Sequence, residues 1–180
     1  MTTVTVTDTL AAPVEHVFAA FTDIEHQAAR VSGIKGVEVL TTGGFRLGTR
    51  WRETREVLGR LDDAEMNVTQ FEQNRGYTIS HDKAGARIDT IFAFEPVGDG
   101  TRVSITFALE NQGLPPGLLT PVSWAIAGKV KEALARDLAD MKKSVEEYRR
   151  AGRHGRPARP APSASGSTTS RVSRSTSCRR

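Results

Sequence analysis

The stretch LLTPVSWAIAGKVKEALARDLADMKKSVEEY, residues 118–148, decides the fold of this chain. Apolar side chains recur in it at steps of three or four residues, which places them on one side of a helix. The members of this stripe are Val122, Ile126, Val130, Leu134, Leu138, Met141, Val145 and Tyr148. Charged residues occupy the other sides of the helix. A helix of roughly 28 residues spans about 40 Å, so it is long enough to lie across a whole small sheet.

The residues before this helix have the composition of β-strands. The predicted strands are 2–10, 37–41, 49–58, 64–73, 77–81, 87–95 and 102–110. Short connections rich in Gly, Asn and Asp predict hairpins and hence an antiparallel sheet. Two short helices are expected after the first strand, one beginning at Pro13 and one over 23–29. The sequence predicts an α+β fold in which a curved sheet of about seven strands holds one long C-terminal helix, with a gap for apolar ligands between them.

The composition changes from Ala151 onward to Arg, Pro, Ser, Thr, Gly and Ala. Residues 1–149 are therefore predicted to form one domain, and residues 150–180 a disordered basic tail. The net charge of +4 is misleading, because seven of the 25 basic residues and none of the 21 acidic residues follow residue 150. The domain is mildly acidic, so no specific nucleic-acid partner is predicted. The tail is either a solvated segment without a role or an arm that binds anions weakly.

The apolar stretches, the cysteine count and the absence of known motifs indicate the cellular compartment and the cofactors to expect. No stretch approaches the 18 or more apolar residues of a membrane span, and the N-terminus lacks the pattern of a secretory signal. Cys178 is the only cysteine, so neither an internal disulfide nor a cysteine-rich metal site can form. A cytoplasmic protein is expected, as a monomer or a homodimer. No glycine-rich phosphate loop or nucleophile elbow occurs, and no cofactor is predicted.

Three segments resemble the START-related, polyketide-cyclase-like superfamily (SRPBCC), which has the helix-grip fold. The opening VTDTLAAPVEHVFAAFTDIEHQAARVSGI (6–34) is similar to the family's first strand and the short helices that follow it. GTRWRETREV (48–57) resembles a central strand, and GDGTRVSITFALE (98–110) resembles the strand before the last helix. The resemblance covers about residues 1–148 and implies the fold. The superfamily includes aromatases and cyclases, lipid carriers, hormone-binding proteins and co-chaperones, so the resemblance leaves the function open.

Strand alternation indicates which side chains point toward the long helix. Trp51, Glu53, Arg55 and Val57 share one face of their strand, and the apolar members suggest that this face is internal. Buried charges are costly unless paired, so Glu53 and Arg55 are expected to form an ion pair with each other or with neighbours. They are either a structural pair or the groups that orient a ligand or act in acid–base chemistry.

Aromatic and branched side chains line the same face of the later strands. These rows are Tyr77 and Ile79 with His81, then Ile88, Thr90, Phe92 and Phe94, then Val103, Ile105, Phe107 and Leu109. They form the core, and in a second interpretation their central members, Ile79, Phe92 and Phe107, line a ligand cavity. The resemblance implies that the first turns of the last helix rim such a pocket, where Trp124 either gates the ligand or anchors the packing.

His81 is the best single candidate for a general acid or base, because the pKa of a histidine lies near neutrality. Glu53 and Tyr77 are the other candidates. Because His81 immediately precedes Asp82-Lys83 at a predicted turn, an exposed side chain without a role is the expected placement. His16 and His26 have no ligand-like spacing to it, so no metal site is predicted.

Three functions remain open from the sequence. The leading hypothesis is the binding of a hydrophobic small molecule, such as a lipid, polyketide or aromatic metabolite, in the gap between sheet and helix. Trp51, Glu53, Arg55, Tyr77, Ile79, Phe92, Phe107 and Trp124 would contact it. The second is a polyketide aromatase, cyclase or dehydratase that uses His81, Glu53 or Tyr77 for proton transfer. The third is a co-chaperone-like module that binds a protein partner.

Overall fold

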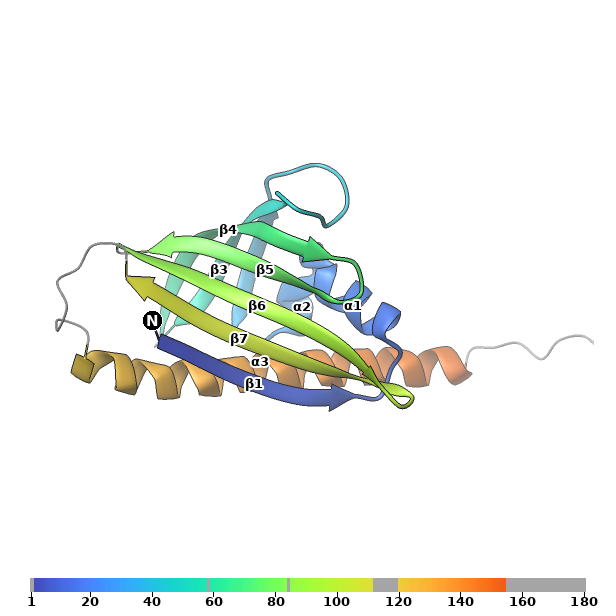
Figure 1. Ribbon diagram of the computed structural model, residues 1–180. Helices are drawn as coiled ribbons and strands as arrows, with labels where there is room; N and C mark the ends of the chain where they lie inside the picture. Colours follow the sequence, from blue (N-terminus) through green and yellow to red (C-terminus); the bar gives the residue numbers. More distant parts are fainter. Residues whose placement is uncertain (1, 58, 84, 112–119, 155–180) are drawn as a thin grey trace, which may run out of the picture.

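The computed structural model describes residues 2–57, 59–83, 85–111 and 120–154, and only the backbone of residues 2, 57, 111, 120–126 and 151–154. The predicted tail is outside this range from residue 155 onward. Seven strands form one antiparallel sheet in the order β1-β7-β6-β5-β4-β3-β2 (Figure 1). The elements are β1 (Thr2–Leu10), α1 (Val14–Thr22), the 3₁₀ turn η1 (Ile24–His26), α2 (Gln27–Arg30), β2 (Ile34–Val39), β3 (Arg50–Val57), β4 (Arg60–Glu72), β5 (Gly76–Lys83), β6 (Ala86–Val97), β7 (Gly100–Asn111) and α3 (Thr120–His154). The predicted α+β architecture is confirmed.

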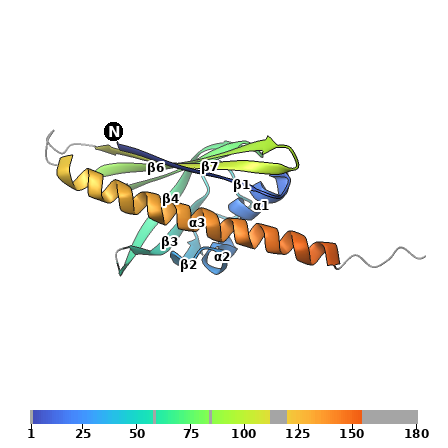
Figure 2. The same ribbon diagram turned by 90° about the horizontal axis from the view of Figure 1, so that it is seen from below.

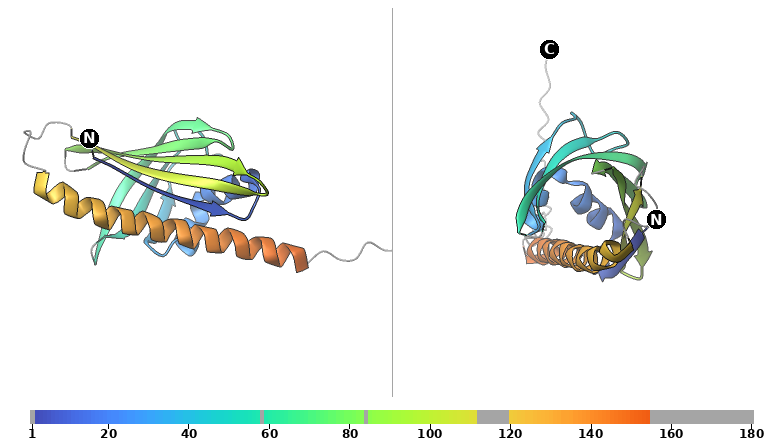
Figure 3. Two further views of the ribbon diagram at one scale, coloured as in Figure 1. Left: turned by 60° about the horizontal axis from the view of Figure 1, so that its bottom comes forward. Right: turned by 90° about the vertical axis from the view of Figure 1, so that its left-hand side faces the viewer.

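The sheet curls around an interior, and α3 runs across its open side. Viewed from one end, the strands form an arch that α3 closes, with α1 and α2 at the far end (Figure 3). From below, the N-terminus of β1 and the beginning of α3 lie at the same end of the molecule (Figure 2). The C-terminal half of α3 lies over the end that holds α1 and α2. The interior therefore has two ends, one filled by α1 and one facing the beginning of α3.

The strand register defines the inner face of the sheet, which is the face toward α1 and α3. One row across it runs from Val6 through Ile105 and Phe92 to Tyr77, each residue directly opposite the next. A second row runs through Val4, Phe107, Thr90, Ile79 and Val68. Because side chains alternate between the two faces of a strand, these rows confirm the predicted inward set on β5, β6 and β7.

The polar residues of β1 and β7 lie on the outer face. Thr5 and Thr7 form hydroxyl–hydroxyl bonds with Thr106 at 2.9 Å and Ser104 at 3.0 Å. The alternation of Thr and Val in β1 thus separates a solvated face from a buried one, as the sequence predicted. No helix in the described part of the chain is long and apolar enough to cross a membrane.

The structure differs from the predicted elements at several points. Asp62 and Asp63 lie inside β4 rather than in a turn, since Thr54 donates a hydrogen bond to Asp63 at 2.6 Å and Lys83 contacts Asp62. The short helix expected over 23–29 is a 3₁₀ turn followed by one turn of α-helix. Helix α3 continues to His154, and Tyr148, assigned to the apolar stripe, is 85% exposed. The last turns of α3 extend past the sheet (Figure 1).

Candidate functional site

The inner face changes from fully buried to half-buried along four strands. At the α1 end, Leu10, Phe94 and Val103 are buried, as is Tyr77. At the other end, Val4, Ile79 and Phe107 are only half-buried although they lie on the same face, whereas Val68 of β4 in the same row is buried. A uniform core would bury both ends equally. The apolar surface at the second end is therefore incompletely covered by the described side chains.

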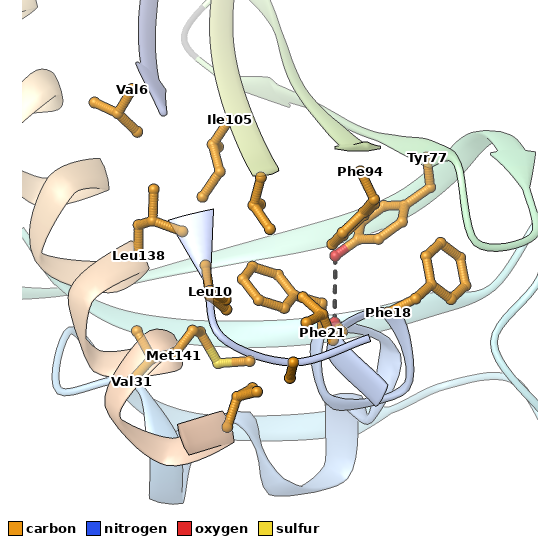
Figure 4. Packing of buried hydrophobic residues seen from close by; sticks show 14 of the residues in the cluster. Val6, Leu10, Phe18, Phe21, Val31, Tyr77, Phe94, Ile105, Leu138 and Met141 are labelled. Carbon is orange, nitrogen blue, oxygen red and sulfur yellow. Dashed lines mark hydrogen bonds between the residues drawn. The ribbon is translucent and has the colours of Figure 1, made fainter. Parts of the chain in front are cut away.

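Helix α1 explains why one end is closed. Phe18 makes edge-to-face contacts with Tyr77 and Phe94 (Figure 4) and also with Phe71, with ring centroids 5.2–6.0 Å apart. Phe21 contacts Phe94 in the same way at 5.4 Å. Such edge-to-face pairs add stability beyond the area they bury. The spacing of Val17, Phe18 and Phe21 on one side of α1 thus builds a solid aromatic wall at one end of the interior.

Tyr77 belongs to this wall. Its ring stacks on Phe92 with centroids 4.6 Å apart. Its hydroxyl donates a hydrogen bond to the carbonyl of Phe21 at 3.2 Å, drawn as a dashed line in Figure 4. Burial, and after it the negative charge of Glu53, raise the pKa of Tyr77. The hydroxyl therefore keeps its proton, and that proton is already used to fix α1 to the sheet.

Three charged residues meet where β3 passes beneath α3. Arg55 Nε donates to Glu53 Oε1 at 2.6 Å, and Arg55 Nη1 donates to Asp137 Oδ2 of α3 at 2.7 Å. Trp51 Nε1 donates to the second oxygen of Glu53 at 3.2 Å. Glu53 and Asp137 are buried, and Arg55 is partly exposed. The expected ion pair between Glu53 and Arg55 is confirmed, and we call Glu53, Arg55 and Asp137 the charged triad.

Asp137 was missed by the sequence analysis, which placed it on a polar side of the helix. A signal was available, because Asp137 is three residues after Leu134 and four before Met141, both members of the apolar stripe. An acidic residue in such a stripe points to a buried partner. Gly33 leaves room for it: a methyl group on Gly33 would lie 3.2 Å from Asp137 Oδ1 and 3.5 Å from Arg55 Nη1.

Burial and charge act in opposite directions within the triad. Burial raises the pKa of Asp137, the positive charge of Arg55 opposes this, and the negative charge of Glu53 adds to the increase. Burial alone would lower the pKa of Arg55, but the charges of Glu53 and Asp137 outweigh it and raise that pKa. Arg55 therefore remains charged and is shared between two carboxyl groups.

Further polar contacts attach the C-terminal half of α3 to both edges of the sheet. On the β1 side, Lys142 Nζ contacts Asp8 at 2.9 Å, and the backbone N–H of Ala11 donates to Glu146 at 3.2 Å. On the opposite side, the N–H and the hydroxyl of Ser32 donate to Asp140 at 2.9 and 2.7 Å. The charged triad adds a contact between β3 and α3. Helix α3 is therefore held across the interior rather than along one edge alone.

His81 is half-buried on the inner face of β5, and the exposed placement expected from the sequence is wrong. Strand β5 continues to Lys83, so the turn lies further along the chain. His81 Nδ1 is buried and has no hydrogen-bond partner among the described residues. Burial lowers the pKa of His81, and the negative charge of Glu53 partly opposes this. The neutral imidazole is thus favoured at neutral pH.

This lowered pKa makes the stability depend on pH. Because the folded pKa lies below the value of 6.5 in the unfolded chain, the unfolded state binds the proton more readily. The free energy of unfolding should therefore fall as the pH drops from about 6.5 through the folded pKa. In urea titrations at about pH 7.5 and about pH 5, His81→Gln should show a smaller loss than the wild type. An equal loss in both proteins would contradict the burial of this ring.

The predicted ligand contacts occupy different parts of the interior. Trp51 is buried against Phe45, with ring centroids 6.3 Å apart, whereas Ile79, Phe92 and Phe107 are half-buried. The side chains of Trp124 and Val57 lie outside the described residues. Within the described part of the chain, no three His, Cys, Asp or Glu side chains converge as metal ligands. The arrangement offers an apolar surface with one charged edge.

Comparison with known proteins identifies the family. Residues 1–146 match the model of a family described as "Polyketide cyclase / dehydrase and lipid transport". No functionally curated protein matches the sequence.

Solved structures share the fold at low sequence identity. TTHA0849 from Thermus thermophilus has a TM-score of 0.69 at 19% identity, over 82% of this chain and 99% of that one. The Zhui aromatase/cyclase from Streptomyces sp. R1128 gives 0.66 at 18% identity, over 84% and 97%. A START superfamily protein from Mycobacterium smegmatis gives 0.65 at 22% identity, over 81% and 98%. These likenesses confirm the helix-grip fold, and the family match confirms the resemblance seen in the sequence. The chain therefore belongs to the polyketide cyclase/dehydrase and lipid-transport family.

Proposed function

We propose that this protein binds a hydrophobic small molecule between the sheet and α3. The observation that carries this proposal is the half-buried apolar surface at one end of the inner face, next to a fully packed aromatic wall at the other. A solvated apolar surface inside a curved sheet gains free energy at about 25 cal/mol per Å² when a ligand covers it. The family, whose description names both cyclases and lipid transport, supports the same conclusion.

Different residues of the inner face would contribute different interactions to ligand binding. Ile79, Phe92 and Phe107 would supply the apolar contact, and Trp124 would add to it from the beginning of α3. Glu53 and Arg55, at the charged edge, would orient a polar group of the ligand. Tyr77 and Trp51 are held in the packed part of the interior by neighbouring rings, so their role is to keep the wall of the site in place.

Phe107→Ala tests the apolar contact. Binding of the neutral dye Nile red, followed by its fluorescence, should weaken about tenfold, because about 1.4 kcal/mol of apolar contact is lost. Ile91→Ala is the matched control, since Ile91 is a partly exposed apolar residue on β6 whose cross-strand partner Thr106 points to the outer face. Ile91→Ala should bind as the wild type does. Equal affinity of Phe107→Ala and wild type would contradict the proposed location.

A second function, proton transfer to a bound polyketide-like substrate, is favoured by one observation. His81 presents a buried ring nitrogen without a partner among the described residues, and the charge of Glu53 acts on this ring. A neutral imidazole in the field of a carboxylate is suited to accept a proton.

This second function makes its own prediction. If the protein is a cyclase or dehydratase, Glu53→Gln and His81→Ala should lower turnover by about 100-fold or more while changing the substrate Kd by much less. Single-turnover rates and equilibrium titration with the same substrate separate the two quantities. A parallel loss of rate and affinity would support binding alone.

A further inference from the structure

The charge balance of the interior restricts which ligands can enter it. In the described part of the chain, three half-buried cations beside the inner face are already paired with carboxylates. Arg55 contacts Glu53 and Asp137, Lys83 contacts Asp62, and Lys142 contacts Asp8. The stretch 112–126, whose side chains are outside the described residues, contains no Lys, Arg or His in the sequence. These three cations are engaged and the stretch 112–126 adds none, so the described side chains beside the inner face offer an acidic ligand no half-buried cation that lacks a partner.

Acceptors outnumber charged donors at the same place. Two buried carboxyl groups share the single guanidinium of Arg55, and the indole N–H of Trp51 supplies one further donor to Glu53. The neighbouring His81 offers a ring nitrogen with no partner among the described residues. A ligand carboxylate placed here would be a buried charge without compensation, which is costly. A hydroxyl group can donate to Glu53 and carries no charge.

We propose that the site selects uncharged hydrophobic molecules whose polar end is a hydroxyl group directed at Glu53, and excludes the same skeletons when they end in a carboxylate. This inference rests on the proposed binding function and specifies the chemical class of its ligand. It separates alcohols and phenols from fatty acids and aromatic acids. Selectivity of this kind arises from repulsion of the wrong ligand as much as from attraction of the right one.

Three naphthalenes of the same shape provide the test: 2-naphthol, 2-naphthoate and 2-methylnaphthalene. Their affinities are measured at neutral pH by displacement of Nile red from the full-length protein. The wild type should bind 2-naphthol about tenfold or more tightly than 2-naphthoate, which corresponds to one hydrogen bond to a charged group. 2-Methylnaphthalene should bind between the two or close to 2-naphthol.

Glu53→Gln should reduce this preference to about threefold or less, because the amide removes the repelling charge at nearly constant shape. Glu38→Gln is the matched control, since Glu38 is exposed and pairs with Arg52 at 2.5 Å on the outer side. It should retain the full preference. The wild-type comparison alone remains decisive if Glu53→Gln fails to fold.

The results of these experiments separate the proposed selectivity for hydroxyl-bearing ligands from the proposed binding function. Equal binding of 2-naphthoate and 2-naphthol by the wild type would overturn the selectivity while leaving the binding function intact. A preference that survives unchanged in folded Glu53→Gln would also overturn it, because the selecting group would then lie elsewhere. Failure of Nile red and of all three naphthalenes to bind would overturn both proposals.

Discussion

Arg55→Met should lower the free energy of unfolding by about 3 kcal/mol. The substitution keeps much of the side-chain volume and removes the only cation that Glu53 and Asp137 contact in the described structure. Both carboxyl groups are buried. Each must then become protonated, or water must enter between β3 and α3 to solvate it. Urea denaturation monitored by circular dichroism measures the change.

Two further variants identify the cause of this loss. Arg52→Met removes the neighbouring arginine of an exposed pair with Glu38 and should cost about 0.5 kcal/mol or less. Combining Arg55→Met with Glu53→Gln and Asp137→Asn should recover most of the loss, because no buried charge remains unpaired. If Arg55→Met is as stable as Arg52→Met, the triad does not hold α3 on the sheet.

Phe18→Ala should be the most destabilising single truncation, at about 4 kcal/mol, with a fall in Tm of about 10 °C. Phe18 is 2% exposed and contacts three aromatic rings, so its removal leaves a cavity in the closed end of the interior. Thermal unfolding followed by circular dichroism gives the change in Tm.

Phe107→Ala provides the comparison from the open end of the same face. Because Phe107 is half-buried, its truncation should cost less than half as much stability as that of Phe18, although it weakens ligand binding more. Leu61→Ala, at a residue 70% exposed, should change stability by about 0.5 kcal/mol or less. Equal destabilisation by Phe18→Ala and Phe107→Ala would show that the interior has no open end.

The fold was predictable because its two periodicities are clear in the sequence. Alternation of Thr and Val over 2–10, and apolar steps of three and four residues after Val130, each match one kind of element. Turn residues located the hairpins at Asn74-Arg75-Gly76 and Val97-Gly98, where Asn74 and Gly98 take positive φ values of 61° and 56°. Asp62-Asp63 has the composition of a turn but lies within β4, because cross-strand partners stabilise these residues there.

The candidate site was only partly predictable. The inward direction of Glu53 and Arg55 followed from strand alternation, but their partner Asp137 is 82 residues away from Arg55 in the chain and no local pattern links them. The engagement of Tyr77 with α1 also depends on a contact between distant segments. The division of the inner face into a closed and an open end arises from where α1 packs, which the sequence of any one strand does not encode.

Native mass spectrometry of the protein purified from its own host tests the central claim most directly. The account predicts a co-purifying apolar molecule of a defined mass, retained in Ile91→Ala and bound at lower occupancy in Phe107→Ala. The exact mass would also give the number of oxygen atoms, and a formula with a single oxygen would exclude a carboxyl group. A protein that carries no ligand, and whose Tm does not change with any member of a panel of lipids and polyketides, would contradict ligand binding and favour a module that binds a protein partner.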